Sequence, residues 1–191
     1  QARWLRELWA PTRFVGDALR NARLGMPVFD VLPGMRLPPT LHFTRSELGL
    51  PEGRFLFLFA FDMSSTALRK NHLAVVRAFR RAFRSAEPVA LALKVSRGGA
   101  DPTALAALRQ EAGQVGAVVI DSVLPEERLF GLMNACDCYV SLHRSEGFGL
   151  TLAEAMALGK PVIATRYSGN LDFMTPDNSL LVDYRLAPLP S

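Results

Sequence analysis

Residues 138–164, CYVSLHRSEGFGLTLAEAMALGKPVIA, decide the fold. The apolar stretch that ends near Leu142 predicts a strand, and a glycine-rich turn follows it at 147–149. The next segment, 150–158, predicts a helix, and PVIA at 161–164 predicts a second strand. Strand, turn, helix and strand in this order form a βαβ unit, which pairs its two strands in parallel.

The same alternation of apolar runs and helical periodicity extends along the chain. Residues 55–61, FLFLFAF, are a continuous apolar run typical of a strand buried on both faces. Thr12 is a candidate N-cap for a helix that runs to about Ala22. Further strands are predicted at 26–31, 89–95, 117–120 and 180–182. We therefore expect an α/β fold with a doubly wound, mostly parallel, Rossmann-like sheet, in which ligands bind at the carboxyl ends of the strands.

Composition is that of an ordinary globular domain. The chain has 191 residues, 49% of them hydrophobic, and a formal net charge of +4. It has no apolar run of about 18 residues, the length expected of a transmembrane helix. Because the sequence does not begin with Met, we expect a piece of a longer protein. Cys136 and Cys138 are too few for a zinc site, and we expect buried, reduced thiols typical of the cytoplasm.

The pI near 9.5 raises the question of a polyanionic partner. Four arginines recur at helical spacing and form one basic face: Arg77, Arg80, Arg81 and Arg84. We interpret this face as a solvent-exposed helix surface, with peripheral contact with an anionic membrane or a polyanion as the alternative. A net charge this small does not predict a nucleic-acid partner.

The turn at 147–149 has the features of a phosphate site. Its glycines let the backbone bend tightly and approach a ligand, and the helix that follows directs free N–H groups and a partial positive charge toward the turn. Glu146 precedes the turn and Glu154 lies about one helical turn after it. Ionised carboxylates only accept hydrogen bonds, which suits sugar hydroxyls. The arrangement predicts a diphosphate at the helix end with a hydroxyl-bearing ring on each side.

This segment resembles the retaining nucleotide-sugar glycosyltransferases of family 4, which have the GT-B fold. Their signature is two glutamates separated by seven residues, here Glu146 and Glu154. Residues 9–14, WAPTRF, are similar to the start of the family's donor domain, 68–71, LRKN, to its basic loop, and 168–174, SGNLDFM, to the loop after the motif.

The resemblance covers Trp9 to Tyr184 and implies one half of a GT-B enzyme. Residues 1–191 would be a single C-terminal donor-binding domain, with 1–10 the remnant of the interdomain connection. The N-terminal acceptor domain would be absent from this chain.

The resemblance also implies roles for individual residues. Glu146 would contact hydroxyls of the transferred sugar, and Glu154 would hold the ribose diol. Backbone N–H groups would be presented to the sugar and the diphosphate by Phe148, Gly149, Leu150 and Thr151.

Basic residues on the 68–71 loop would neutralise the diphosphate. Lys70 matches the family's lysine for this role, but Ser64 stands where the family often has an arginine. Arg69 is a candidate substitute, although we expect its side chain to point elsewhere than that of Lys70.

For the reaction, the resemblance implies transfer of a sugar from a nucleoside diphosphate sugar with retention of anomeric configuration. The donor is a substrate, and neither a metal nor another cofactor is expected. The acceptor would be a glycan or a lipid-linked molecule bound by the missing domain. We expect a cytoplasmic protein, with peripheral contact at the inner face of the membrane as an alternative. The base would be bound by the loops after Val95 and Ile120, through backbone groups near Val123 and Leu124.

Two other classes stay open from the sequence. In an NAD-type oxidoreductase the 147–153 segment would be a loose dinucleotide fingerprint with Asp172 as its acid. However, that fingerprint belongs to the first βα turn of a sheet, and its acid should end the next strand, which here finishes near Ala164. A non-catalytic nucleotide-sugar-binding or scaffolding domain would have the same sequence features. His143, at a strand end, is predicted to be structural or substrate-adjacent, with a catalytic histidine as the alternative.

Overall fold

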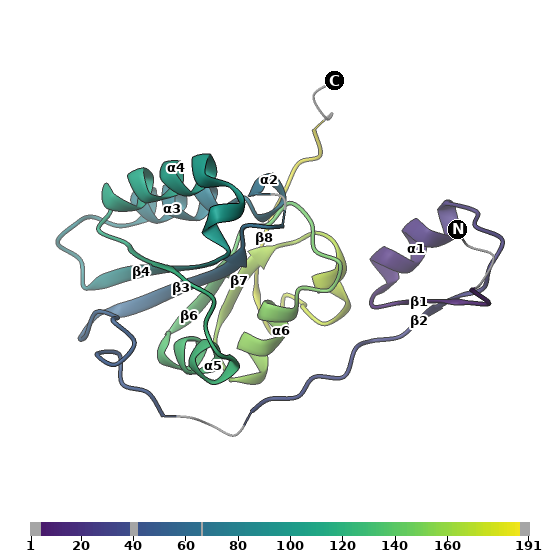
Figure 1. Cartoon of the computed structure of the whole chain (residues 1–191), viewed down its shortest axis with the longest axis horizontal. Coiled ribbons are helices and arrows are strands. Elements are labelled where there is room, and N and C mark those ends of the chain that lie inside the picture. The colour runs from purple at the N-terminus through teal and green to yellow at the C-terminus, as the bar shows by residue number, and fades with distance from the viewer. Residues whose placement is uncertain (1–4, 39–41, 66, 188–191) are drawn as a thin grey trace.

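The computed structural model describes residues 5–38, 42–65 and 67–187. Its main body is a parallel sheet in the order β5-β4-β3-β6-β7-β8 (Figure 1). The strands are β3 (Phe55–Asp62), β4 (Val89–Ser96), β5 (Val118–Asp121), β6 (Cys138–Ser141), β7 (Val162–Thr165) and β8 (Leu180–Val182). The predicted α/β, doubly wound fold is confirmed.

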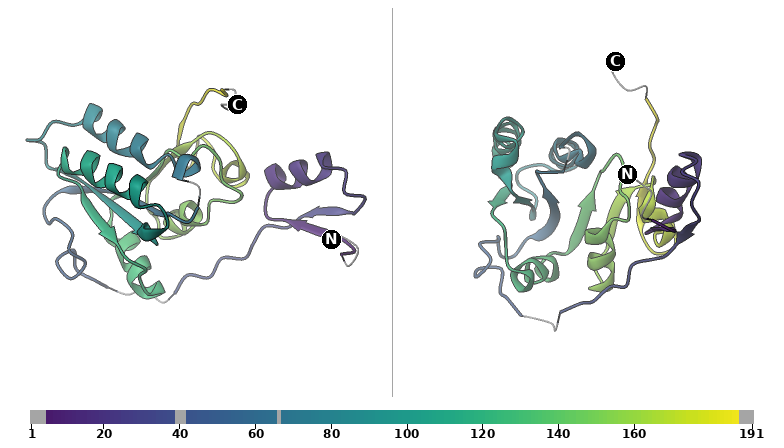
Figure 2. Two further views of the ribbon diagram at one scale, coloured as in Figure 1. Left: turned by 45° about the horizontal axis from the view of Figure 1, so that its top comes forward. Right: turned by 45° about the vertical axis from the view of Figure 1, so that its right-hand side comes forward.

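Helices lie on both faces of this sheet. In Figures 1 and 2, α3 (His72–Ala82) and α4 (Pro102–Gly113) cover one face, and α5 (Glu126–Ala135) and α6 (Leu150–Ala157) cover the other. Shorter turns are α2 (Ala67–Lys70), η2 (Gly98–Ala100) and η3 (Gly169–Asp172).

The core forms where the sequence has its longest apolar runs. β3 and β4 pair along their whole length, from Phe55 opposite Val89 to Asp62 opposite Ser96. Side chains on both faces of these strands are buried, which explains their lack of polar alternation. Cys136 and Cys138 are both free and buried as predicted, and burial raises the pKa of the Cys136 thiol to about 12.

The strand order reverses between β3 and β6. From β3 the chain builds the sheet outward to β5, then returns to place β6 on the other side of β3. Loops after β3 and β6 therefore diverge from a common point at the carboxyl edge, where open α/β sheets bind their ligands. The loop after β3 contains 68–71, and the loop after β6 contains 142–149.

The strand predicted at 26–31 is wrong in one respect, because it lies outside the main sheet. β2 (Val28–Asp30) pairs in parallel only with β1 (Leu8–Ala10), which the sequence did not predict. With α1 (Arg13–Asn21), which Thr12 caps as predicted, these strands form a separate βαβ unit (Figure 1). A three-residue strand carries too little pattern to reveal its partner.

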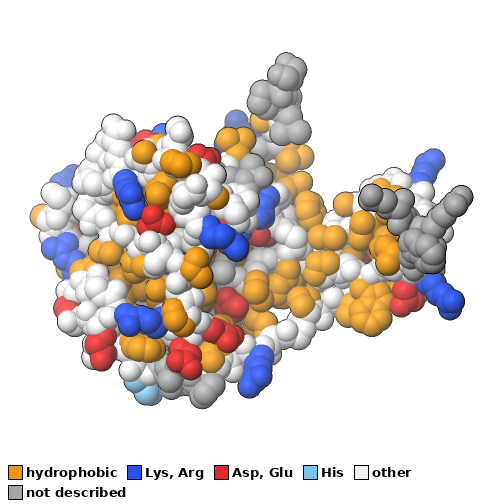
Figure 3. Space-filling model, in the orientation of Figure 1, with side chains coloured by type: hydrophobic (Ala, Val, Ile, Leu, Met, Phe, Trp, Pro, Cys, Tyr) orange, Lys and Arg blue, Asp and Glu red, His pale blue; other side chains and the backbone are white. Residues whose placement is uncertain are grey.

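The β1–α1–β2 unit has large apolar side chains exposed on its surface. Trp9 is 68% exposed and Phe29 is 48% exposed. Figure 3 shows hydrophobic side chains gathered over this unit, whereas acidic and basic side chains are interspersed on the main body. A two-stranded sheet is marginally stable unless it packs against another element, and α1 packs against both strands here. Of the 1–10 segment, residues 1–4 lie outside the described residues.

Within the described residues, we find no helix with the length and hydropathy needed to cross a lipid bilayer.

Candidate functional site

Three of the predicted residues meet at the strand-order reversal. Lys70 Nζ lies 2.6 Å from Glu146 Oε1, and Arg69 Nη1 lies 2.9 Å from Glu146 Oε2. Arg69 Nη1 also donates to the Ser145 carbonyl at 2.9 Å. The expectation that Arg69 points away from Lys70 is wrong. Both are long side chains on the single turn of α2, and the partly buried carboxylate between the loops attracts both cations.

The environment of Glu146 determines its charge. Burial opposes ionisation of this carboxyl, but the Lys70 ammonium and the Arg69 guanidinium outweigh it and hold the pKa below its ordinary value. Glu146 is therefore an ionised carboxylate at neutral pH, with two cations within hydrogen-bonding distance. An acceptor of this kind, at the carboxyl edge of a sheet, suits hydroxyl groups of a bound sugar.

The glycine-rich turn is built as the sequence predicts. Gly149 has φ of 92° and is the N-cap of α6. Because it provides no side-chain cap, the first N–H groups of α6 depend on a ligand or water for partners. Phe148 and Gly149 precede the helix, and Leu150 and Thr151 begin it. This helix end is next to Glu146 in the chain, so anion-binding donors and a carboxylate share one loop.

Glu154 lies on α6 in a different electrostatic environment. Its burial raises the pKa to about 7, and repulsion from Glu126 on α5 acts in the same direction. The two glutamates of the motif therefore differ: Glu146 is stabilised as a carboxylate, whereas Glu154 is about half protonated near neutral pH.

A guanidinium that the sequence analysis missed lies at the end of β3. Arg97, from the loop after β4, forms an ion pair with Asp62, in which Nε and Nη2 of the guanidinium each donate to one carboxylate oxygen. Ser64 donates to the same carboxylate from its hydroxyl at 2.7 Å. These contacts, with the Arg97 hydrogen bonds the largest, lower the pKa of Asp62 to about 2. Ser64, on the loop after β3, and Arg97, on the loop after β4, therefore share one carboxylate.

His143 is buried and hydrogen-bonded. It is 1% exposed, its Nδ1 lies 3.1 Å from Ser141 Oγ, and its Nε2 lies 3.1 Å from Asn170 Oδ1. Burial lowers its pKa, so the ring is neutral at pH 7. The structural role predicted for His143 agrees with this environment.

The β1–α1–β2 unit contacts the Glu146 loop and the loop after β7. Thr12 Oγ1 donates to the carbonyl of Gly147 at 2.6 Å, and the Arg13 amide donates to Asp172 Oδ2 at 2.8 Å. Phe14 packs edge-on against Tyr167 with ring centroids 5.5 Å apart. Asp172, the acid of the NAD-type alternative, therefore lies on η3 and pairs with Arg13, and it does not end a strand. Its position does not support that alternative.

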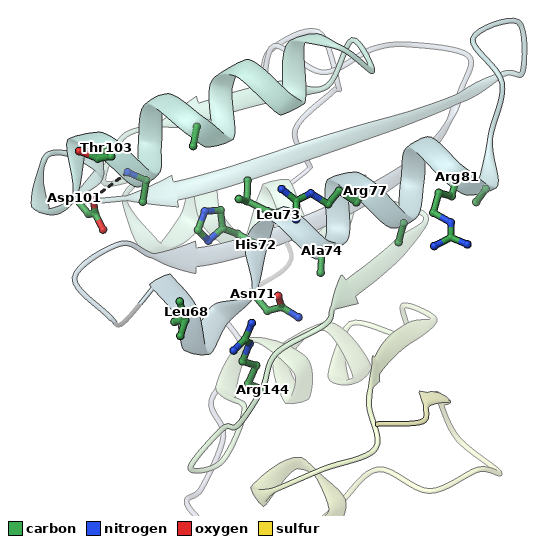
Figure 4. Close-up of a pocket in the computed structure, with 14 residues that line it drawn as sticks. Leu68, Asn71, His72, Leu73, Ala74, Arg77, Arg81, Asp101, Thr103 and Arg144 are labelled. Carbon is green, nitrogen blue, oxygen red and sulfur yellow. Dashed lines mark hydrogen bonds between the residues drawn. The ribbon is translucent and has the colours of Figure 1, made fainter. Parts of the chain in front are cut away.

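A separate groove of about 900 Å³ lies between α3 and α4 (Figure 4). Arg77, Arg81 and Arg144 line it, but neither glutamate of the motif is among its described lining residues. Arg77 binds Glu111 and Arg80 binds Gln114, at 2.8 and 2.5 Å. Partners of this kind are typical of a solvated helix face.

Over residues 5–38, 42–65 and 67–187, no group of three or more His, Cys, Asp or Glu side chains is placed to hold a metal ion.

With this geometry in view, comparison with known proteins identifies the family. The family model for glycosyl transferases group 1 matches residues 42–185. The chain belongs to this family. Similar curated proteins include D-inositol 3-phosphate glycosyltransferases from Arthrobacter sp. (strain FB24), 31% identical over 126 residues, and Xylanimonas cellulosilytica, 33% identical over 145 residues. These matches cover 66% and 73% of this chain but 30% and 33% of the relatives, so the chain spans about a third of their length.

Solved structures agree on the fold of this group 1 domain. Anabaena HepE (Alr3699) in complex with UDP-glucose has a TM-score of 0.71 at 19% identity, over 95% of this chain and 50% of HepE. A UDP-forming trehalose-phosphate synthase from Burkholderia xenovorans has a TM-score of 0.59 at 15% identity, over 69% of this chain and 34% of the synthase. With the family match, these likenesses confirm the C-terminal, Rossmann-like half of a GT-B glycosyltransferase.

The cluster of Lys70, Arg69 and Glu146 predicts a pH-dependent contribution to stability. We expect Lys70→Met to lower the free energy of unfolding at pH 7 by about 1–3 kcal/mol, because one cation remains for a partly buried carboxylate. The pKa of Glu146 is lower in the folded chain than its ordinary value of 4.5, so this loss is complete above that value and shrinks as the pH falls through the folded pKa. Urea unfolding at roughly pH 3 and pH 7 measures it.

Lys160→Met is the matched control. Lys160 Nζ donates to the neutral carbonyl of Asn134 at 2.5 Å and acts on the Asp137 carboxylate only as a minor charge interaction, so the cost of its loss should depend less on pH. Equal pH dependence in the two variants would contradict the ion-pair assignment.

Proposed function

We propose that this chain is the donor-binding half of a retaining glycosyltransferase that takes its sugar from a nucleoside diphosphate sugar. The observation that supports it best is the meeting of Lys70, Arg69 and Glu146 beside the uncapped N-terminus of α6. Cations and helix N–H groups suit a diphosphate, and the carboxylate suits the attached sugar. HepE, a protein of the same fold, is described in complex with UDP and with UDP-glucose.

In this proposal, donor binding changes the partner of Lys70. The ammonium now paired with Glu146 would turn toward the diphosphate, which frees one carboxylate oxygen for a sugar hydroxyl. As the glycosidic bond breaks, negative charge grows on the leaving diphosphate. Lys70 and the amides of Phe148 to Thr151 would stabilise that charge, and removing one such donor typically costs about 10²–10³ in rate. No metal ion is needed in this scheme, because these groups supply the positive charge.

The nucleoside would lie on the other side of the helix end. Glu154 would accept from the ribose diol, and the loops after β4 and β5 would contact the base, near Val123 and Leu124. Val123 is 71% exposed and so accessible to a base. Ser64 is neutral, so the second positive charge near the diphosphate would come from Arg97, just after β4. Its guanidinium would leave Asp62 and bind a phosphate.

The acceptor, a glycan or a lipid-linked molecule, would be bound by a second domain. The β1–α1–β2 unit has its own sheet and exposed apolar side chains, and the family match begins at residue 42. We therefore place the boundary between the two domains within 31–44, later than the 1–10 connection expected from the sequence. The protein would act in the cytoplasm, and with a lipid-linked acceptor it would contact the inner face of the membrane peripherally.

Binding of UDP and UMP tests the proposed site. We expect UDP to bind at least about tenfold more tightly than UMP, because Lys70 and the α6 amides address the second phosphate. Isothermal titration of the chain measures both affinities, and Lys70→Met should remove most of the difference. Lys160→Met is again the matched control. Equal affinities for UDP and UMP in the unmodified chain would contradict the proposed site.

Glu154 predicts a pH dependence of nucleotide binding. Its pKa of about 7 means that the ionised form rises about tenfold between pH 6 and pH 8, and only this form accepts fully from two hydroxyls. UDP affinity should rise over this range by up to the same factor. Glu154→Gln, neutral at every pH, reports the contribution of the phosphate's own titration. If both proteins show the same slope, Glu154 does not hold the ribose.

The isolated chain should bind the donor without transferring the sugar. Transfer requires that the donor and the acceptor hydroxyl be held in the correct relative position. Such positioning raises the effective concentration of one reactant to roughly 10⁵–10⁸ M. One domain fixes the donor but cannot position an acceptor hydroxyl. Assays with a panel of nucleotide sugars and glycan or lipid-linked acceptors should show slow donor hydrolysis at most. Turnover to glycoside at about 1–10³ s⁻¹ would show that the second domain is dispensable.

A further inference from the structure

Ser168 has a backbone conformation that is rare for any residue except glycine. Its φ is 84° and its ψ is −154°, a combination that a Cβ atom disfavours. The side chain is nevertheless buried, with the residue 5% exposed. A strained residue persists only where its surroundings determine its position, and such residues concentrate at functional sites.

The side chain of Ser168 contacts the backbone of Glu146. Ser168 Oγ accepts a hydrogen bond from the Glu146 amide at 2.7 Å and donates its own hydrogen to the Tyr167 carbonyl. The next amide, that of Gly169, donates to the Glu146 carbonyl at 3.0 Å. Both backbone polar groups of Glu146 are therefore bound by two consecutive residues of one loop.

The two loops are in direct backbone contact. A Cβ atom placed on Gly169 would lie 2.1 Å from the Gly147 carbonyl oxygen, so a side chain at this position would push the loops apart. The close approach determines the distance at which the hydroxyl of Ser168 meets the Glu146 amide.

The loop that carries Ser168 is itself anchored in the core. Asn170 is fully buried, donates to the Thr165 carbonyl at 3.0 Å, and lies against His143 Nε2. His143 in turn contacts Ser141 at the end of β6. The anchoring runs from the ends of β6 and β7 through His143 and Asn170 to Ser168, which binds the Glu146 backbone, whereas Lys70 and Arg69 bind its side chain.

We infer that Ser168 is a positioning residue for Glu146: its hydroxyl fixes the Glu146 backbone so that the carboxylate is presented to the sugar of the donor. The inference rests on the proposed function for the identity of that ligand. It assigns to the hydroxyl of Ser168 a contribution to sugar recognition and none to recognition of the nucleotide.

Ser168→Gly tests the inference without adding strain, because glycine adopts this conformation freely. Amide hydrogen exchange by NMR should be about tenfold faster at Glu146 and unchanged in β3 and β4. In titrations, the gain in affinity from UDP to the best nucleotide sugar of a panel should fall about three- to tenfold, whereas UDP affinity stays the same. Ser179→Ala is the matched control, because its hydroxyl donates to the Thr175 carbonyl at 2.8 Å, outside the Glu146 loop.

Two results would overturn the inference. Unchanged exchange at Glu146 would show that the hydroxyl does not fix this backbone. An equal loss of affinity for UDP and for the nucleotide sugar would show a general structural role. If the unmodified chain binds no member of the panel, the proposed function fails, and the exchange rate at Glu146 still decides whether Ser168 holds that residue.

Discussion

The ion pairs of Glu146 with Lys70 and Arg69 join the two loops on which the site depends. The partners are 76 and 77 residues apart in the chain and meet because the strand order reverses between β3 and β6. A buried carboxylate is costly unless it is paired, so it draws both cations into the site. Both oxygens of the Glu146 carboxylate are already paired with cations. A donor bound as proposed would therefore exchange partners within the cluster, and its diphosphate would compete for the two cations.

The two glutamates of one motif show how environment divides chemically identical groups. Glu146 is held ionised by adjacent cations, whereas Glu154 has only burial and another glutamate near it. A group that recognises a neutral sugar beside two cations gains from being charged before the ligand arrives. A carboxyl with a pKa near 7 instead ionises at little cost when hydroxyl donors approach it. In the proposed function, the helix end between them would supply N–H donors for the diphosphate, and the three parts would follow the order of a nucleotide sugar.

The sequence predicted the elements with strong patterns and missed those without. FLFLFAF is long and apolar enough to identify β3, and the segment around Gly149 identified the turn and α6 to within one residue. β1 has three residues and its partner follows a helix, so nothing in the pattern predicted a second sheet. Contacts between loops that are far apart in the chain could not be predicted from the sequence either. Arg97 reaches Asp62 and Ser168 reaches Glu146 only because strand order brings their loops together.

The loop at Gly147 connects the two parts of the chain. Its carbonyl accepts from Thr12 of the β1–α1–β2 unit, and the neighbouring Glu146 is bound by Ser168 of the main body. Thr12 is buried, and its hydroxyl also accepts from the Val15 amide as the N-cap of α1. Moving the unit away from the main body would thus break a hydrogen bond to the Glu146 loop and also the contacts of Arg13 and Phe14 with the loop after β7. The position of the unit and the geometry of the Glu146 loop are therefore coupled most directly through Thr12.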